Sequence, residues 1–131
     1  MKLVTKNTDY ALRALVYLSK KPGEYVSTSE IAEWENIPLQ YLRAITRKLI
    51  KAKILVSREG VAGGVRLNVL PSEIPLIDVM KIFQGEFQLS SCMFRKQICP
   101  NRQTCVLRSK IGEIEALVAA EFEKISIENL I

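Results

Sequence analysis

The order of local patterns between residues 27 and 69 places the strongest constraint on how this chain folds. Residues 27–30 (Ser-Thr-Ser-Glu) have the form of a capping box, in which Ser27 caps a short helix and Glu30 reaches back. Residues 36–38 (Asn-Ile-Pro) form a turn, with proline well placed to start a second helix over residues 38–52. Two helices joined by a short turn are typical of a helix-turn-helix.

The predicted helix 38–52 has an apolar side and a basic side. At about 100° per residue, the apolar residues on one side are Leu42, Ile45, Leu49 and Ala52. The opposite side carries Gln40, Arg43, Ala44, Arg47 and Lys51. A solvated helix surface has the same composition, so the basic side favours DNA recognition only in combination with the segment that follows it.

Two short strands separated by glycines come directly after this helix. Residues 54–58 and 65–69 are plausible strands, and residues 60–64 (Gly-Val-Ala-Gly-Gly) form the turn between them. A hairpin in this position is the wing of a winged helix-turn-helix. Arg58 and Arg66 flank its tip, where they could meet phosphate or the minor groove.

Helical patterns flank this region on both sides. A helix from about Thr8 to residue 20 is predicted, with Thr8 as its cap and Asp9 favourable in its first turn, and another over residues 76–84 stops at Gly85. From about residue 105 to 131, apolar residues recur at steps of three or four. The apolar face of a helix this long is too extended to be covered by one small domain, so a second copy of the chain is expected to cover it in a homodimer. The alternative is that the helix folds back onto its own domain.

These elements predict a mainly α fold with a small β wing, in which a winged helix-turn-helix domain carries a long C-terminal dimerisation helix. The expected division is residues 1–84 for the DNA-binding domain, 85–105 for a cysteine-bearing loop and 106–131 for the dimerisation helix. The chain has no run of about 18 apolar residues, and its first residues lack the apolar core of a signal peptide. A cytoplasmic protein that does not bind membranes is expected.

All three cysteines lie close together, at Cys92, Cys99 and Cys105. An unexported chain with an odd number of cysteines is expected to use them as thiols or metal ligands rather than in structural disulfides. Thiolates are soft ligands that suit iron–sulfur clusters and zinc. We interpret this segment as the holder of an iron–sulfur cluster whose state controls DNA binding. Such clusters are usually held by four ligands, so three thiolates leave one ligand to be supplied from elsewhere.

Composition argues against an enzyme and for a polyanionic partner. The chain has no histidine, which excludes His-assisted nucleophilic catalysis and imidazole ligands, and it has no Walker A or dinucleotide-binding glycine loop. Its net charge of +5 is unevenly placed, because residues 1–70 hold 12 Lys and Arg against 6 Asp and Glu. A basic first half beside a nearly neutral second half fits a nucleic-acid-binding module joined to an assembly module.

Taken together, these features resemble the Rrf-type bacterial transcriptional regulators, the family of IscR and NsrR. The resemblance covers essentially the whole chain. Its most specific parts are residues 8–13 (Thr-Asp-Tyr-Ala-Leu-Arg), the Tyr41-Leu42 pair, the glycine turn 60–64, residues 76–79 (Leu-Ile-Asp-Val) and the three cysteines.

The resemblance implies a dimeric regulator, most simply a repressor, that binds a palindromic operator in double-stranded DNA and holds a cluster on Cys92, Cys99 and Cys105. Some family members add a histidine three residues after the last cysteine, where this chain has Arg108. Others take an aspartate from the first helix, where this chain has Asp9. This favours a four-iron cluster over a two-iron cluster, with Asp9 donated across the dimer, although a helix dipole alone would favour an acidic residue there.

The signal would be nitric oxide, redox state, or iron and cluster supply. The expected DNA contacts are Ser29, Gln40, Tyr41, Arg43, Arg47, Arg58 and Arg66. Many relatives have glutamate where this chain has Arg43, and arginine where it has Glu59, so the operator sequence does not carry over. Two alternatives remain: a thiol-redox or zinc-dependent winged-helix repressor, and a small electron-transfer iron–sulfur protein.

Overall fold

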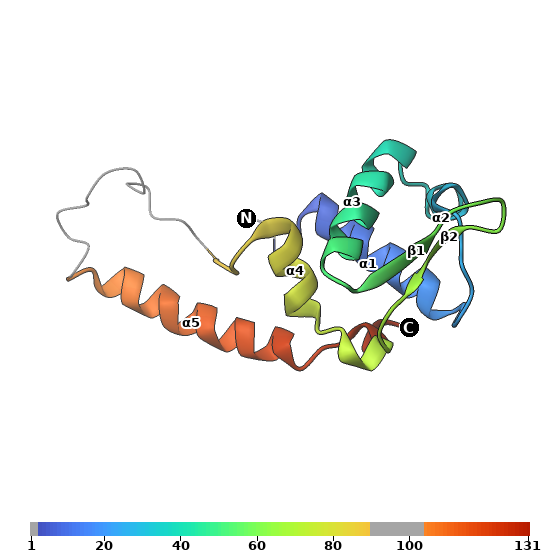
Figure 1. Ribbon diagram of the computed structural model, residues 1–131. Coiled ribbons are helices and arrows are strands. Elements are labelled where there is room, and N and C mark those ends of the chain that lie inside the picture. Colours follow the sequence, from blue (N-terminus) through green and yellow to red (C-terminus); the bar gives the residue numbers. More distant parts are fainter. Residues whose placement is uncertain (1–2, 90–103) are drawn as a thin grey trace.

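The computed structural model describes residues 3–89 and 104–131 and confirms the mainly α fold with a β wing (Figure 1). Its elements follow in the order α1 (Lys6–Ser19), α2 (Thr28–Glu35), α3 (Leu39–Lys51), β1 (Leu55–Arg58), β2 (Gly64–Leu67), the 3₁₀ turn η1 (Pro71–Glu73), α4 (Leu76–Gln84), α5 (Val106–Glu123) and the 3₁₀ turn η2 (Ile127–Leu130). Within the described residues, no helix is long and apolar enough to cross a membrane.

The helix-turn-helix forms as its local signals predict, with α2 and α3 joined at Asn36. Asn36 ends α2 in a left-handed conformation, with φ of 53°, and such a conformation is tolerated by asparagine better than by most residues. Ser27 caps α2 by accepting a hydrogen bond from the backbone N–H of Glu30 at 3.1 Å. The apolar stripe of α3 is buried as predicted, through Leu42, Ile45 and Leu49.

The Glu30 side chain does not complete the capping box. Its carboxylate instead accepts hydrogen bonds from the Tyr17 hydroxyl at 2.8 Å and from the Lys21 ammonium at 3.0 Å. These two donors hold the pKa of Glu30 below its ordinary value, while the bond to Glu30 raises the pKa of Tyr17. The prediction of a reciprocal capping box was therefore wrong, because Glu30 anchors α2 to the end of α1.

The wing is an antiparallel hairpin that is extended by one residue pair from the segment before α2. Strands β1 and β2 pair with Ser57 opposite Val65 and Arg58 opposite Gly64. Val26 forms a bridge with Val65, with N···O distances of 2.9 and 2.8 Å. Gly64 permits this close approach, because a Cβ atom there would lie against the carbonyl of Val26.

Helix α1 lies at the centre of the core, against α3, α4 and the C-terminal turn η2. Its cap is Thr5, which accepts from the N–H of Thr8, so the prediction of Thr8 as the cap was wrong. Thr8 is fully buried and its hydroxyl donates instead to Oε1 of Gln84, at the end of α4, at 2.8 Å.

Gln84 uses both ends of its amide on the start of the chain. Its Oε1 atom also accepts from the backbone N–H of Thr5 at 3.1 Å, and its Nε2 atom donates to the carbonyl of Leu3 at 3.0 Å. Because residue 85 follows Gln84 directly, the cysteine-bearing segment begins beside the first turn of α1.

The chain after α4 departs from the expectation of one helix to the C-terminus. Helix α5 ends at Glu123, and the remaining residues return to the core around α1. Ile127 is fully buried in the main core, and its N–H donates to the carbonyl of Ile74 at 3.0 Å. The C-terminal end of α5 is held by Phe122, which packs edge-on against Phe87 with ring centroids 5.4 Å apart.

The rest of α5 extends away from the domain, so that its first turn lies at the end of the molecule opposite the wing (Figure 1). None of its residues is buried. Four large apolar side chains along it are 52–69% exposed, and these are Val106, Leu107, Ile114 and Leu117. Within one chain, the apolar face of α5 is therefore mostly uncovered.

Candidate nucleic-acid interface and metal centre

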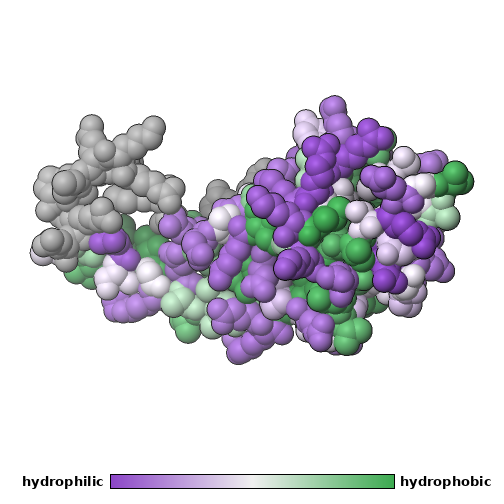
Figure 2. All heavy atoms as spheres, viewed as in Figure 1, coloured by the Kyte–Doolittle hydropathy of each residue, from purple (hydrophilic) through white to green (hydrophobic). Residues whose placement is uncertain are grey.

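The outer face of α3 presents the side chains that the sequence assigns to DNA. Gln40, Tyr41, Arg43 and Arg47 are all exposed, because the three buried leucine and isoleucine positions of α3 fix the opposite face against the core. Hydrophilic side chains gather over this helix in Figure 2. Ser29, on the first turn of α2, is also exposed.

A groove of about 310 Å³ runs between α3 and the inner face of the wing. Arg43 and Arg47 line it on the helix side, and Ser57 and Gly64 line it on the wing side. Ser27 and Thr28, at the start of α2, close one end of it. Sequence reasoning missed these two residues and Ser57, because they reach the groove only through the bridge between Val26 and Val65.

Lys6 adds a further positive charge at the edge of this surface. Its ammonium lies 5.7 Å from the ring centroid of Tyr10 and 5.8 Å from that of Tyr41. These contacts place the start of α1 beside the first turn of α3. The Tyr41 side chain, which lies at this junction, is half-exposed.

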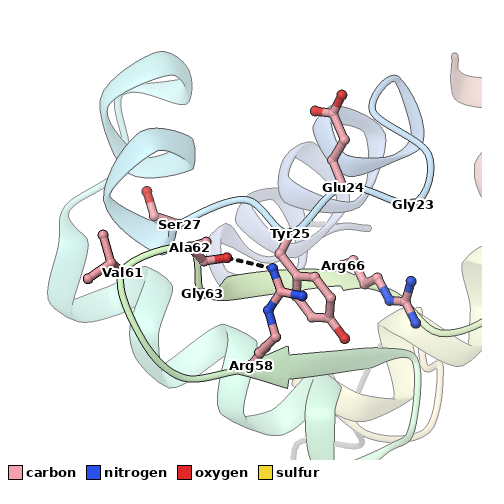
Figure 3. A pocket seen from close by; sticks show the side chains of 9 residues that line it. All are labelled: Gly23, Glu24, Tyr25, Ser27, Arg58, Val61, Ala62, Gly63 and Arg66. Carbon is pink, nitrogen blue, oxygen red and sulfur yellow. Dashed lines mark hydrogen bonds between the residues drawn. The ribbon is translucent and has the colours of Figure 1, made fainter.

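The wing arginines lie on the other face of the hairpin, away from this groove. The Arg58 and Arg66 guanidinium groups pack on the ring of Tyr25, at 4.2 and 4.9 Å from its centroid (Figure 3). The structure therefore brings Arg43 and Arg47 together in one place and Arg58 and Arg66 together in another. Tyr25 carried no recognisable signal in the sequence.

Cys105 is the only one of the three predicted cysteine ligands that falls within the described residues; Cys92 and Cys99 lie outside them. Cys105 is a half-buried free thiol at the N-cap of α5, and its Sγ atom accepts from the backbone N–H of Arg108 at 3.4 Å. The partial positive charge at a helix N-terminus suits a thiolate ligand. The position thus has the right chemistry for a metal ligand.

Asp9 lies in the first turn of α1, where its carboxylate is about half-exposed and forms an ion pair with Arg13 at 3.0 Å. Arg13 also donates to the carbonyl of Glu35 at 3.0 Å. A carboxylate held this way is accessible to a second chain. Helix α1 lies within the domain, whereas the start of α5 lies at the far end of the molecule from the wing (Figure 1). Among the described residues of one chain, no group of three metal-binding side chains is found.

Comparison with known proteins identifies one family over nearly the whole chain. Residues 4–131 match the model of the Rrf2 family, described as an iron-dependent transcriptional regulator. The HTH-type transcriptional regulator NsrR of Bacillus subtilis is 29% identical over 133 residues, covering 100% of this chain and 90% of that protein. NsrR of Oceanobacillus iheyensis is 30% identical over 128 residues, covering 96% of this chain and 87% of that protein.

Solved structures support the same fold. CymR, the global cysteine regulator of B. subtilis, matches with a TM-score of 0.77 at 23% identity, covering 99% of this chain and 96% of that one. IscR of T. potens matches with a TM-score of 0.77 at 21% identity, covering 99% of this chain and 85% of that one. At these identities the likeness extends to the fold alone.

Proposed function

The chain belongs to the Rrf2 family of transcriptional regulators, and from this membership we propose that it is a homodimeric repressor whose binding to a palindromic operator is controlled by an iron–sulfur cluster. Members of this family are regulators of transcription and not enzymes. The observation that carries the proposal is the exposed basic face of α3, which shares a groove with the wing.

The roles proposed for the residues of α3 follow from their positions. Arg43 and Arg47 lie one turn apart on the exposed face, so both can reach one major groove. Arginine is suited to the O6 and N7 atoms of guanine. Gln40, Tyr41 and Ser29 surround them and are proposed to contact base edges or phosphates, and Arg58 and Arg66 to contact phosphate beside the wing.

The uncovered face of α5 supports the homodimer. A helix with four large apolar side chains more than half exposed has a strong tendency to associate, and a second copy of α5 presents a matching surface. A palindromic operator then follows, because two recognition helices related by a two-fold axis read half-sites about 34 Å apart.

The proposed cluster ligands are Cys92, Cys99 and Cys105 with Asp9 of the second chain. The exposure of Asp9, and the separation of α1 from the start of α5 within one chain (Figure 1), support donation across the dimer. When bound, the cluster would supply metal–thiolate and metal–carboxylate bonds between these residues, and the single aspartate favours the four-iron form proposed from the resemblance. Arg13 holds the Asp9 carboxylate at the surface of α1 and would have to release it.

A thiol switch or a zinc site is the second candidate. The free, half-buried Cys105 thiol supports it, as does a neighbour of the same fold solved as the oxidized form of Staphylococcus aureus CymR, at 24% identity. Metal and sulfide analysis separates these candidates from the cluster.

Arg47→Ala is expected to lower affinity for a DNA fragment spanning the protein's own promoter by about 5- to 100-fold, because an arginine contact to a base is worth about 1–3 kcal/mol. If Arg47 also neutralises a phosphate, the slope of log affinity against log salt falls by about one. Fluorescence anisotropy at several KCl concentrations measures both. Lys124→Ala removes an exposed charge just after α5, away from α3, as a control and should change neither. Unchanged affinity and slope for Arg47→Ala would show that α3 is not the recognition helix.

Protein purified without oxygen is expected to contain iron and sulfide and to absorb in the visible range. Asp9→Ala should shorten the lifetime of this absorbance in air by about 10-fold or more, because even residues that only hydrogen-bond to a metal ligand commonly contribute about 10- to 100-fold to metal affinity. Glu33→Ala, which removes an exposed carboxylate from α2, is the matched control. Colourless protein without iron or sulfide contradicts the cluster, and zinc in its place supports the second candidate.

A further inference from the structure

Tyr25, Arg58 and Arg66 lie together on the outer face of the wing, and the pairing of the strands explains why. Val26 bridges Val65, and both side chains are buried, so the residues next to them along each strand point outward. These outward neighbours are Tyr25 and Arg66. Arg58 joins them from β1, where it lies opposite Gly64, which has no side chain to separate it from Tyr25.

The tyrosine ring fixes the position of both guanidinium groups. Their Cζ atoms lie 4.2 Å (Arg58) and 4.9 Å (Arg66) from the ring centroid, within the range in which a cation is attracted to an aromatic face. Arg58 is held further by a hydrogen bond from its Nη2 atom to the carbonyl of Ala62 at 2.9 Å, drawn in Figure 3. The wing turn, the tyrosine and the two arginines therefore form one ordered cluster.

This cluster holds two positive charges that no carboxylate neutralises. Within residues 3–89 and 104–131, neither Arg58 nor Arg66 has an ion pair, and the Nε atom of Arg66 is buried without a hydrogen-bond partner. Glu24 lines the same cleft but does not pair with either arginine. Both arginines line one cleft, and an anion bound in it would offset the repulsion between their charges.

The cleft beside the cluster is open and adjoins the DNA-binding groove. It has a volume of about 620 Å³ and is lined by the three side chains, Ser27 and the glycine turn. Ser27 also lines the groove beside α3, so the two depressions meet at the start of α2. A nucleic-acid strand that leaves the α3 groove past Ser27 would next meet the cluster.

We propose that Tyr25, Arg58 and Arg66 form a clamp for one phosphate group of the DNA backbone, in which Tyr25 is the positioning residue. This inference rests on the DNA binding proposed above, including the phosphate contacts of Arg58 and Arg66, and adds to it that Tyr25 positions both arginines on one phosphate. Guanidinium groups held by a ring bind phosphate with little further loss of side-chain freedom, so the clamp contributes through preorganisation as well as charge.

Substitution of the ring tests the clamp. Tyr25→Leu keeps an apolar side chain but removes the aromatic face, and it should weaken binding to promoter DNA about three- to ten-fold and lower the salt slope by about one. Tyr25→Phe keeps the face and should bind like the parent protein. Thermal unfolding of each variant shows that the fold is intact, and Tyr25→Ser provides a second loss of the ring if the leucine variant is unstable.

A double-mutant cycle separates positioning from general support of the fold. Arg58→Ala with Arg66→Ala should lower the slope by about one, because the two arginines share one phosphate, and adding Tyr25→Leu to that background should have no further effect on affinity or slope. A merely structural ring would weaken binding by the same factor in both backgrounds, which would overturn the proposal. Equal DNA affinity and slope for Tyr25→Leu and the parent protein would overturn it as well.

Two further outcomes have distinct meanings. If the parent protein binds no DNA at all, the proposed function fails and this inference fails with it. Titration with inorganic phosphate or pyrophosphate distinguishes the source of the anion. The anion could stabilise the protein against thermal unfolding only when both arginines are present, while DNA binding does not need them. That pair of results would overturn the DNA clamp in favour of a small-anion site.

Discussion

Gly64→Ala is expected to destabilise the protein by about 3 kcal/mol, because a methyl group there would have no space. The new Cβ would press on the carbonyl of Val26 and lie 2.8 Å from the backbone nitrogen of Ser27. Relief of this overlap separates Val26 from Val65 and loses their paired hydrogen bonds. The start of α2 and the wing would then move apart, so DNA affinity should fall together with the free energy of unfolding.

Gly112→Ala is the matched control, because a Cβ atom there meets nothing within 4 Å in the chain. Gly112 lies inside α5, where alanine is preferred over glycine by about 0.5–1 kcal/mol. Chemical denaturation should therefore give changes of opposite sign for the two substitutions. If Gly64→Ala unfolds at the same denaturant concentration as the parent protein, the bridge between Val26 and Val65 is not part of the fold.

Ile127→Ala is expected to lower the free energy of unfolding by about 3–4 kcal/mol. Ile127 is completely buried in the core around α1, although it comes from the last residues of the chain. Its removal leaves a cavity and weakens the contact of the C-terminal segment with η1 and with the start of α4, where the backbone N–H of Leu76 donates to the carbonyl of Ile125 at 2.8 Å. Chemical denaturation monitored by far-ultraviolet circular dichroism measures the loss.

Ile131→Ala makes the same chemical change four residues later, where the side chain is 56% exposed, and should alter stability by less than about 0.5 kcal/mol. A small effect at Ile127 would mean that the C-terminus does not pack into the domain in solution. The expected difference between the two variants therefore locates the point at which the chain returns to its core.

Short-range signals predicted the helix-turn-helix and the wing well. The helix expected over residues 38–52 is α3 (Leu39–Lys51), and the helix expected over residues 76–84 is α4, with Gly85 as its stop. Apolar spacing, proline and glycine act on their immediate neighbours, so a local pattern is sufficient for these elements.

The features that sequence reasoning missed depend on distant partners. Thr8 has the right chemistry for a helix cap, but its hydroxyl is taken by Gln84, 76 residues later in the chain. Glu30 is similarly taken by Tyr17 and Lys21. At the C-terminus, the apolar repeat continues through Ile125 and Ile127, so it could not distinguish a continuing helix from a segment that turns back into the core.

The candidate site divides in the same way. The positions of Arg43 and Arg47 followed from helical periodicity, whereas Tyr25 entered the site through a cross-strand contact that no spacing in the sequence reveals. The full ligand set of Cys92, Cys99, Cys105 and Asp9 remains a prediction, since Cys92 and Cys99 lie outside the described residues and Asp9 is proposed to come from a second chain.

The fixed C-terminal end of α5 makes this helix a lever arm. Eighteen residues at 1.5 Å per residue give it a length of about 27 Å, with Cys105 at its outer tip and Ile127 close to its pivot. A tilt of about 10° at the pivot displaces the tip by roughly 5 Å. Conversely, a movement of a few ångströms at Cys105 would rotate the proposed DNA-binding domain at the other end of α5. A small structural change at a ligand bound to Cys105 would therefore be enough for a large reorientation of that domain.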